Sequence, residues 1–301
     1  MGKGRAKTGP YASARGKARE SDGAMLKREL IGQSIDYLLR HLDEGVTIKA
    51  VADHFHYSES YFSRVFKAVT GVSVYAFFKH LKLDQSAIDI KLKHHRAITD
   101  IGLYYGYSSS NYSSAFSQHH GLSPAAFRKS AAAASIANPF CPETVDCFEA
   151  FEAYDSRIRI AELQDMPVVY ERVYGSYGDL EEKWYQFLAA NKELIHDQTL
   201  MIERFYDDPA IASWSTCLCD LCLTSDRAGE SGSAATIRGG RFAVYRYEGE
   251  IRHIFRALQG IFTVWFPRSG YEMAEKYGLN IYQRVDRESG CVVMDLCIPV
   301  K

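Results

Sequence analysis

One polar face of a predicted helix, over about residues 59–69, carries side chains that can read a DNA duplex. Four residues fall on this face at helical spacing: Ser60, Ser63, Arg64 and Lys67. An arginine can donate to both acceptors of a guanine edge, and a serine can hydrogen-bond a base or a phosphate. These residues are therefore candidate DNA contacts, although an arginine on an isolated surface helix can equally serve only to solvate it.

The elements that would position this face form a helix-turn-helix. Thr47 can cap a short helix that turns Val51 and Ala52 inward, and Ser58 can cap the helix that follows. A small residue at position 52 allows the two helices to pack closely. The second helix places its apolar residues on the face away from the polar one, namely Phe62, Val65, Phe66 and Val69.

The spacing of this unit recurs 50 residues downstream. The superposed pairs are Ala52 and Gly102, Tyr57 and Tyr107, Ser58 and Ser108, Phe66 and Phe116, Gly71 and Gly121, Ser73 and Ser123, and Phe77 and Phe127. This repetition predicts two copies of one unit. A helix expected over 74–93 separates them by roughly 30 Å, at about 1.5 Å per residue. That length is close to one turn of DNA, roughly 34 Å, so one monomer can read two adjacent segments.

Charge is divided unevenly along the 301 residues. Residues 1–130 hold 19 Lys and Arg against 11 Asp and Glu, whereas residues 131–301 hold 17 against 26. A basic half suits a polyanion such as DNA. No apolar run is long enough to cross a bilayer, and the basic first residues precede no apolar signal segment. We therefore expect a cytoplasmic protein without membrane association.

All seven cysteines lie beyond residue 140, and an odd number without a signal peptide disfavours a disulfide framework. Cys217, Cys219 and Cys222 are close enough together to suggest a zinc site. They lie, however, in the alternating run STCLCDLCLT, which predicts a buried strand. The sequence predicts no metal, no cofactor and no catalytic residue.

Residues 26–129 resemble the DNA-binding domain of the AraC/XylS family of transcription regulators. The resemblance rests on VADHFHYSESYFSRVFKAVTGVS in the first copy and on GYSSSNYSSAF and GLSPAAFR in the second. It implies base contacts by Ser60, Ser63 and Arg64 in the first copy, and by Ser110, Asn111 and Ser114 in the second. Ser114 stands where the family commonly has Arg, and Ser117 where it commonly has Lys. We therefore expect the second copy to contribute less affinity and specificity.

The C-terminal half alternates strand-like and helical patterns. Strands are expected in RIRIAEL, PVVYERVYG and at 200–206 and 214–223, with an amphipathic helix at 179–195. Residues 240–298 repeat this order of elements, and CDLC at 219–222 recurs as MDLC at 294–297. A duplicated strand, helix, strand, strand unit is the simplest interpretation.

This half resembles the GyrI-like effector-binding domain, through VYGSYGDL, FYDDP, GGRFAVYRYEG, VWFPRSGY and MDLCIPV. The resemblance implies a cleft lined by aromatic side chains that admits bulky, often cationic compounds. Many relatives have a Glu where this chain has Asn280, and an amide cannot neutralise a cation unless Glu171, Glu203 or Glu248 supplies the charge. The candidate ligand-binding residues are Trp184, Tyr206, Trp265, Asn280, Tyr282, Tyr170 and Phe242.

The expected fold is multidomain, with an all-α double helix-turn-helix domain followed by an α+β domain of two strand-helix-strand-strand repeats. The expected ranges are a disordered basic tail at 1–24, the DNA-binding domain at 25–130, a linker at 131–153 and the ligand-binding domain at 154–301. The expected function is a transcription regulator, not an enzyme, that binds double-stranded DNA, a small hydrophobic or aromatic effector and RNA polymerase. The alternatives are a hydrolase of a reactive small molecule, disfavoured because Asn280 cannot exchange a proton, and a protein-binding module.

Overall fold

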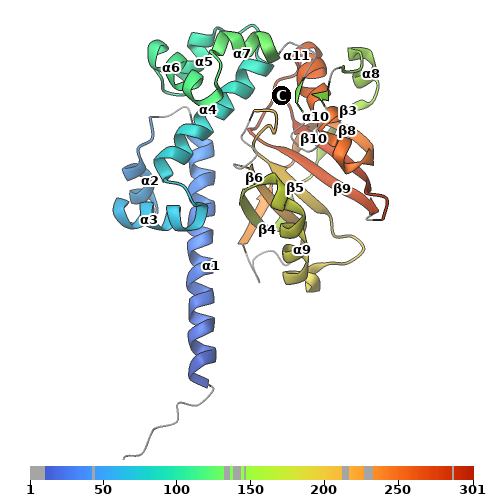
Figure 1. Ribbon diagram of the computed structural model, residues 1–301. Coiled ribbons are helices and arrows are strands. Elements are labelled where there is room, and N and C mark those ends of the chain that lie inside the picture. The colour runs from blue at the N-terminus through green and yellow to red at the C-terminus, as the bar shows by residue number, and fades with distance from the viewer. Residues whose placement is uncertain are drawn as a thin grey trace, which may run out of the picture. The chain divides into compact units, whose positions relative to one another are not determined.

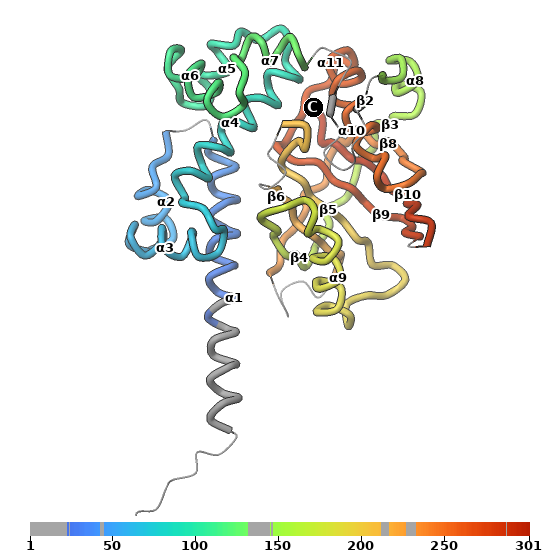
Figure 2. Tube along the Cα trace, in the orientation of Figure 1, coloured from blue at the N-terminus to red at the C-terminus, as the bar shows by residue number. Residues whose placement is uncertain are grey.

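The computed structural model describes residues 11–42, 45–131, 136–137, 144–145, 147–211, 217–226, 233–286 and 288–301. The backbone divides into two compact units, residues 1–78 and 79–301 (Figure 1, Figure 2). An N-terminal helical region is followed by a sheet-rich region with helices, which confirms the predicted two-part layout. Among the described residues, no helix is both long and apolar enough to span a membrane.

The first unit is helical. It contains α1 (Tyr11–Arg40), α2 (Ile48–His54), α3 (Glu59–Thr70) and the start of α4 (Val74–Leu92). Helix α1 begins earlier than the expected start near Leu26, in a stretch rich in the good helix formers Ala, Lys, Arg and Glu. The tail predicted at 1–24 lies outside the described residues for its first ten positions, and the chain is helical from Tyr11 onward.

The turn between α2 and α3 depends on caps and on one unusual backbone conformation. The hydroxyl of Thr47 accepts a hydrogen bond from the Ala50 amide, and that of Ser58 accepts one from the Tyr61 amide, which confirms both predicted caps. His56 has a φ of 61°, and the equivalent position of the second copy is Gly106, with a φ of 80°. The turn therefore requires a left-handed residue, which glycine adopts without strain.

The second copy lies in the second unit. It comprises α5 (Ile98–Tyr104), α6 (Ser109–His120) and α7 (Pro124–Ala131), which follow α4. Gly102 of α5 packs directly against α6, because a Cβ atom at this position would lie 2.7 Å from the ring of Tyr112. Ala52 is fully buried at the equivalent position of the first unit. The predicted close packing through a small residue is thus confirmed in both copies.

The rest of the second unit is built on one eight-stranded antiparallel sheet with the order β3-β8-β10-β9-β5-β6-β4-β7 (Figure 1). Its strands are β3 (Ile158–Leu163), β4 (Met166–Gly175), β5 (Met201–Phe205), β6 (Cys217–Thr224), β7 (Ser233–Ile237), β8 (Gly240–Glu250), β9 (Gly278–Asp286) and β10 (Cys291–Pro299). Of the linker predicted at 131–153, residues 132–135, 138–143 and 146 lie outside those described. The described part includes the pair β1 (Ile136–Ala137) and β2 (Thr144–Val145).

Short helices accompany this sheet. They are α8 (Phe151–Asp155), α9 (Leu180–Ala190), α10 (Ile254–Gly260) and α11 (Phe266–Ser269), with 3-10 turns at Tyr177–Asp179, Lys192–Leu194 and Ile251–His253 and a π-helical turn at Ile261–Trp265. Strand alternation gives the two faces of the sheet different neighbours. On β6, Cys217 and Cys219 pack with Phe187 of α9, whereas Cys222 joins the cluster on the opposite face. The three thiols therefore do not converge.

Replacing Gly102 by Ala should destabilise the second copy by about 1–3 kcal/mol, because the new methyl group overlaps the Tyr112 ring. Urea unfolding of the full chain, followed by circular dichroism, measures the loss. Leu103→Ala is the matched control, because Leu103 is the next residue of α5 and is 60% exposed. Equal stability of Gly102→Ala and the wild type would contradict the packing described here.

Candidate functional site

The polar face of α3 is arranged as the sequence predicts. Ser60, Arg64 and Lys67 are exposed and Ser63 is half-buried. The opposite side of the helix is anchored by Phe62, Val65 and Phe66, all of which are buried. The four polar side chains are therefore available on one side of a helix whose orientation is fixed by its core.

The corresponding face of α6 has a different chemical character. Ser110, Asn111 and Ser114 are exposed, and Tyr112 and Phe116 are buried on the other side. The helix contains no lysine or arginine. It can therefore offer hydrogen bonds to DNA, but no Lys or Arg charge to attract a phosphate.

A buried carboxylate forms the centre of the candidate ligand site. Glu203 of β5 is only 8% exposed. It accepts hydrogen bonds from Trp184 Nε1 at 2.8 Å, from Asn280 Nδ2 at 3.0 Å and from the Tyr282 hydroxyl at 3.0 Å. Strands β5 and β9 pair so that Glu203 lies directly opposite Asn280. Glu203 is one of the three carboxylates that the sequence offered in place of a Glu at position 280, and it faces Asn280 from the neighbouring strand.

One buried hydrogen-bond acceptor in this cluster has no donor. Asn280 directs its NH₂ group at Glu203, and its Oδ1 atom is buried without a hydrogen-bond partner. Burial and the neighbouring Glu203 carboxylate raise the pKa of Tyr282 well above its usual range, so its hydroxyl remains a donor. A carboxylate and a free amide oxygen on adjacent strands together favour a ligand that carries both positive charge and N–H groups.

The other predicted aromatic residues lie elsewhere in the sheet domain. Tyr206 and Tyr170 lie on the opposite face, beside Arg204, whose guanidinium carbon is 5.5 Å and 5.9 Å from the two ring centroids. Trp265 is 1% exposed and donates its Nε1–H to Asp155, and Phe242 is also 1% exposed. The structure therefore brings together Trp184, Asn280 and Tyr282, and it places the remaining four predicted ligand residues in other clusters or in the core.

The two other carboxylates considered for position 280 are less suited to the role. Glu248 is exposed and pairs with Arg284 at 3.3 Å. Glu171 of β4 lies opposite Leu221 of β6, and Leu221 lies opposite Glu203 of β5. Glu171 is therefore on the same face of the sheet as Glu203, but two strands away from it. Pairing between distant strands fixed this assignment, and no local sequence pattern around Glu203 could have indicated it.

A second buried carboxylate holds the opposite face of the sheet together. Asp220 of β6 is completely buried and accepts hydrogen bonds from Arg172, Arg204 and the Tyr206 hydroxyl at 2.6–2.9 Å. Burial by itself raises the pKa of Asp220, but the two guanidinium groups outweigh it and lower this pKa below its usual value. Asp220 therefore stays ionised in the folded protein and completes a closed ionic cluster.

Two protein-family models match different parts of the chain. A model of the helix-turn-helix domain matches residues 51–130, and a model of the GyrI-like small molecule binding domain matches residues 156–301. The right origin-binding protein of Escherichia coli (strain K12) and the transcriptional regulator Rob of Salmonella typhimurium are each 32% identical over 102 residues, or 34% of this chain. This chain spans 35% of the length of each of these relatives.

Other similar proteins match one part of the chain. The probable transcription factor PqrA of Proteus vulgaris is 29% identical over 113 residues, which are 37% of this chain and 84% of that protein. Among solved structures, the C-terminal domain of EcmrR superposes with a TM-score of 0.41 at 12% identity and covers 48% of this chain and 96% of that domain. The structure of SAV2435 bound to tetraphenylphosphonium gives a TM-score of 0.37 at 12% identity, and covers 48% of this chain and 93% of that one.

Asp220→Asn should destabilise the sheet domain by about 3–5 kcal/mol, because Arg172 and Arg204 would stay buried and lose the charged carboxylate that both of them bond. A carboxyl with a depressed pKa contributes stability above its unfolded pKa of about 3.9, and this contribution is lost as pH falls through the folded pKa. Denaturation series between pH 7 and pH 2 should therefore show less acid sensitivity in the variant. Glu248→Gln removes a carboxylate from an exposed ion pair and serves as the control; similar losses in both variants would contradict the role of Asp220.

Proposed function

Because this chain joins an AraC-type helix-turn-helix domain to a GyrI-like small molecule binding domain, we propose that it is an effector-responsive, sequence-specific DNA-binding transcription regulator. The observation that carries the proposal is the buried Glu203 cluster within a chain that also presents the polar face of α3. The functional domains are proposed at 25–130 and 154–301, and RNA polymerase is the proposed protein partner. The sheet domain is proposed to be a duplication, in which β4-α9-β5-β6 and β8-α10-β9-β10 follow the same order.

DNA readout is proposed to rest chiefly on the first copy. Arg64 combines a full charge with the geometry for bidentate contact to guanine, and Ser60 and Ser63 lie beside it on α3. The second copy presents Ser110, Asn111 and Ser114, which are neutral. We assign it mainly backbone contacts that set the position of the protein on the duplex.

The proposed effector is a small aromatic cation that carries at least one N–H group, such as a protonated amine or an amidinium. Glu203 would neutralise the charge, Asn280 Oδ1 would accept the N–H, and Trp184 and Tyr282 would contact the aromatic part. A quaternary ammonium has no N–H to donate. It would leave the buried amide oxygen unpaired and should therefore bind less tightly.

Strand β5, which carries Glu203, is connected to α4 by hydrogen bonds made just after the strand ends. The chain leaves β5 through Asp208, which accepts hydrogen bonds from Lys91 of α4 at 2.9 Å and from Gln259 of α10 at 2.7 Å. Lys91, Asp208 and Gln259 are all less than 10% exposed. We propose that a ligand at Glu203 acts on the DNA-binding helices through a shift of β5 that this buried group transmits to α4.

Arg64→Ala should weaken binding to selected DNA by about 1–3 kcal/mol and relax the sequence preference at one position, because a bidentate base contact is lost. DNA is first selected from a random pool with the full chain, and affinities are then measured by mobility shift. Ser114→Ala is the matched control on the second copy and should change the affinity far less. An unchanged affinity and an unchanged selected sequence for Arg64→Ala would rule out base reading by this residue.

The proposed effector class predicts a difference between two matched ligands, a naphthylmethyl dimethylammonium, which has an N–H, and its trimethylammonium counterpart, which has none. The first should bind about tenfold more tightly in calorimetric titrations, since a hydrogen bond to a charged group is worth about 1.5–3 kcal/mol. Asn280→Leu should abolish this difference, and Glu203→Gln should weaken both ligands. Glu248→Gln is the control. Equal affinity of the two ligands for the wild type would contradict the proposed role of Asn280. Tight binding of both ligands by Glu203→Gln would contradict the proposed binding site.

Hydrolysis of a reactive small molecule is the second candidate function. Asn280 itself cannot exchange a proton, but Glu203 lies opposite it, and a carboxylate between Trp184 and Tyr282 is suited to general acid-base chemistry. Incubation of the full chain with ester, epoxide and lactone substrates, followed by chromatography, separates the two functions. Turnover that is lost in Glu203→Gln would favour the enzyme.

A further inference from the structure

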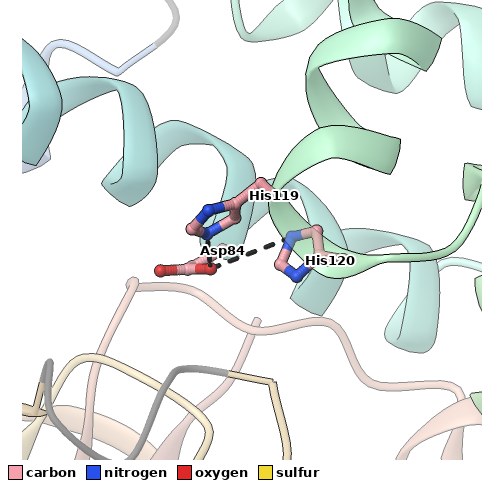
Figure 3. Close-up of side chains that lie close together, drawn as sticks. All are labelled: Asp84, His119 and His120. Carbon is pink, nitrogen blue, oxygen red and sulfur yellow. Dashed lines mark hydrogen bonds and ion pairs between the residues drawn. The ribbon is translucent and has the colours of Figure 1, made fainter.

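A cluster of metal-binding side chains lies between α4 and the C-terminal end of α6, away from the Glu203 site. Asp84 comes from α4, and His119 and His120 are the last two residues of α6 (Figure 3). His119 Nε2 lies 2.8 Å from Asp84 Oδ1, and His120 Nε2 lies 3.8 Å from the same oxygen. Figure 3 shows both imidazole rings directing a nitrogen toward the carboxylate.

The spacing of Asp84 Oδ1, His119 Nε2 and His120 Nε2 fits a metal ion with tetrahedral coordination. In such a site, with bonds of about 2.1 Å, two ligand atoms lie about 3.4 Å apart. The observed separations of 2.8 Å and 3.8 Å bracket this value, and the three candidate ligand atoms all lie within 4.8 Å of one another. Small side-chain rotations would therefore bring all three to bonding distance of one ion.

The surroundings of the cluster also favour metal binding. The His120 side chain is 5% exposed, that of Asp84 14% and that of His119 21%, so the ligands are shielded but reachable. The Nε2 atom of His120 also lies 3.4 Å from the carbonyl oxygen of Leu83, so a bound metal ion would replace this hydrogen bond. His80, one turn before Asp84 on α4, stacks on His119 with ring centroids 4.5 Å apart and restricts its orientation.

We propose that Asp84, His119 and His120 bind a late first-row divalent metal ion such as Zn²⁺ or Co²⁺, which fastens the end of α6 to α4. Two imidazoles and one carboxylate suit these ions better than Mg²⁺ or Ca²⁺, which prefer oxygen ligands. Three protein ligands leave a fourth position for water. Because α6 carries Ser110, Asn111 and Ser114, bound metal would stabilise the second copy of the DNA-binding unit.

The test uses the full chain after chelator treatment and dialysis. Titration with Co²⁺ should produce the visible absorption of a tetrahedral site at one ion per chain, and Zn²⁺ should displace it and raise the melting temperature. The variant His119→Gln/His120→Gln should lose at least about tenfold in metal affinity and should lose the thermal shift. Asp84→Asn, which preserves the shape of the side chain, should weaken binding in the same way.

The matched control is His94→Gln/His95→Gln, which removes an exposed adjacent histidine pair from the same unit. It should bind metal as the wild type does. Circular dichroism of each variant establishes that it is folded. The proposal is overturned if the wild type binds no metal below about 100 µM, or if folded Asp84→Asn and His119→Gln/His120→Gln bind it as tightly as the wild type does.

Discussion

Strand β5 carries two oppositely charged neighbours, Glu203 and Arg204, and both are buried. Strand alternation directs them to opposite faces of the sheet, so each needs its own partners. Arg204 finds Asp220 on the adjacent strand, and Glu203 finds three neutral donors. Arg204 therefore faces a counter-ion of the protein, whereas all three groups that hydrogen-bond Glu203 are neutral.

The two faces of the sheet therefore differ in how their buried carboxylates are paired. Asp220 faces two guanidinium groups and a tyrosine hydroxyl, so its own negative charge is paired within the protein. Glu203 has hydrogen bonds but no counter-ion among the described side chains that contact it. The buried carboxylate of Glu203 is the reason we propose a cationic effector, and the unpaired Oδ1 atom of Asn280 is the reason we propose an N–H group on it.

In each helix-turn-helix copy, the two helices must pack closely on either side of a tight turn. Ala52 and Gly102 leave room for the following helix, and Gly106 supplies the left-handed residue that His56 provides in the first copy. These requirements repeat because they come from backbone geometry. The exposed faces of α3 and α6 are not subject to these requirements. They differ, because α3 carries Arg64 and Lys67 whereas α6 carries no lysine or arginine.

The sequence by itself determined the features that depend on local spacing. Helices α3 and α4, the caps at Thr47 and Ser58, and the polar face around Arg64 follow from helical periodicity and capping chemistry. Only the tertiary structure decided which distant residues meet. Strand pairing placed Glu203 opposite Asn280, and packing of α6 on α4 brought two histidines to one aspartate. Such contacts depend on strand order and helix packing, and no local pattern in the chain encodes them.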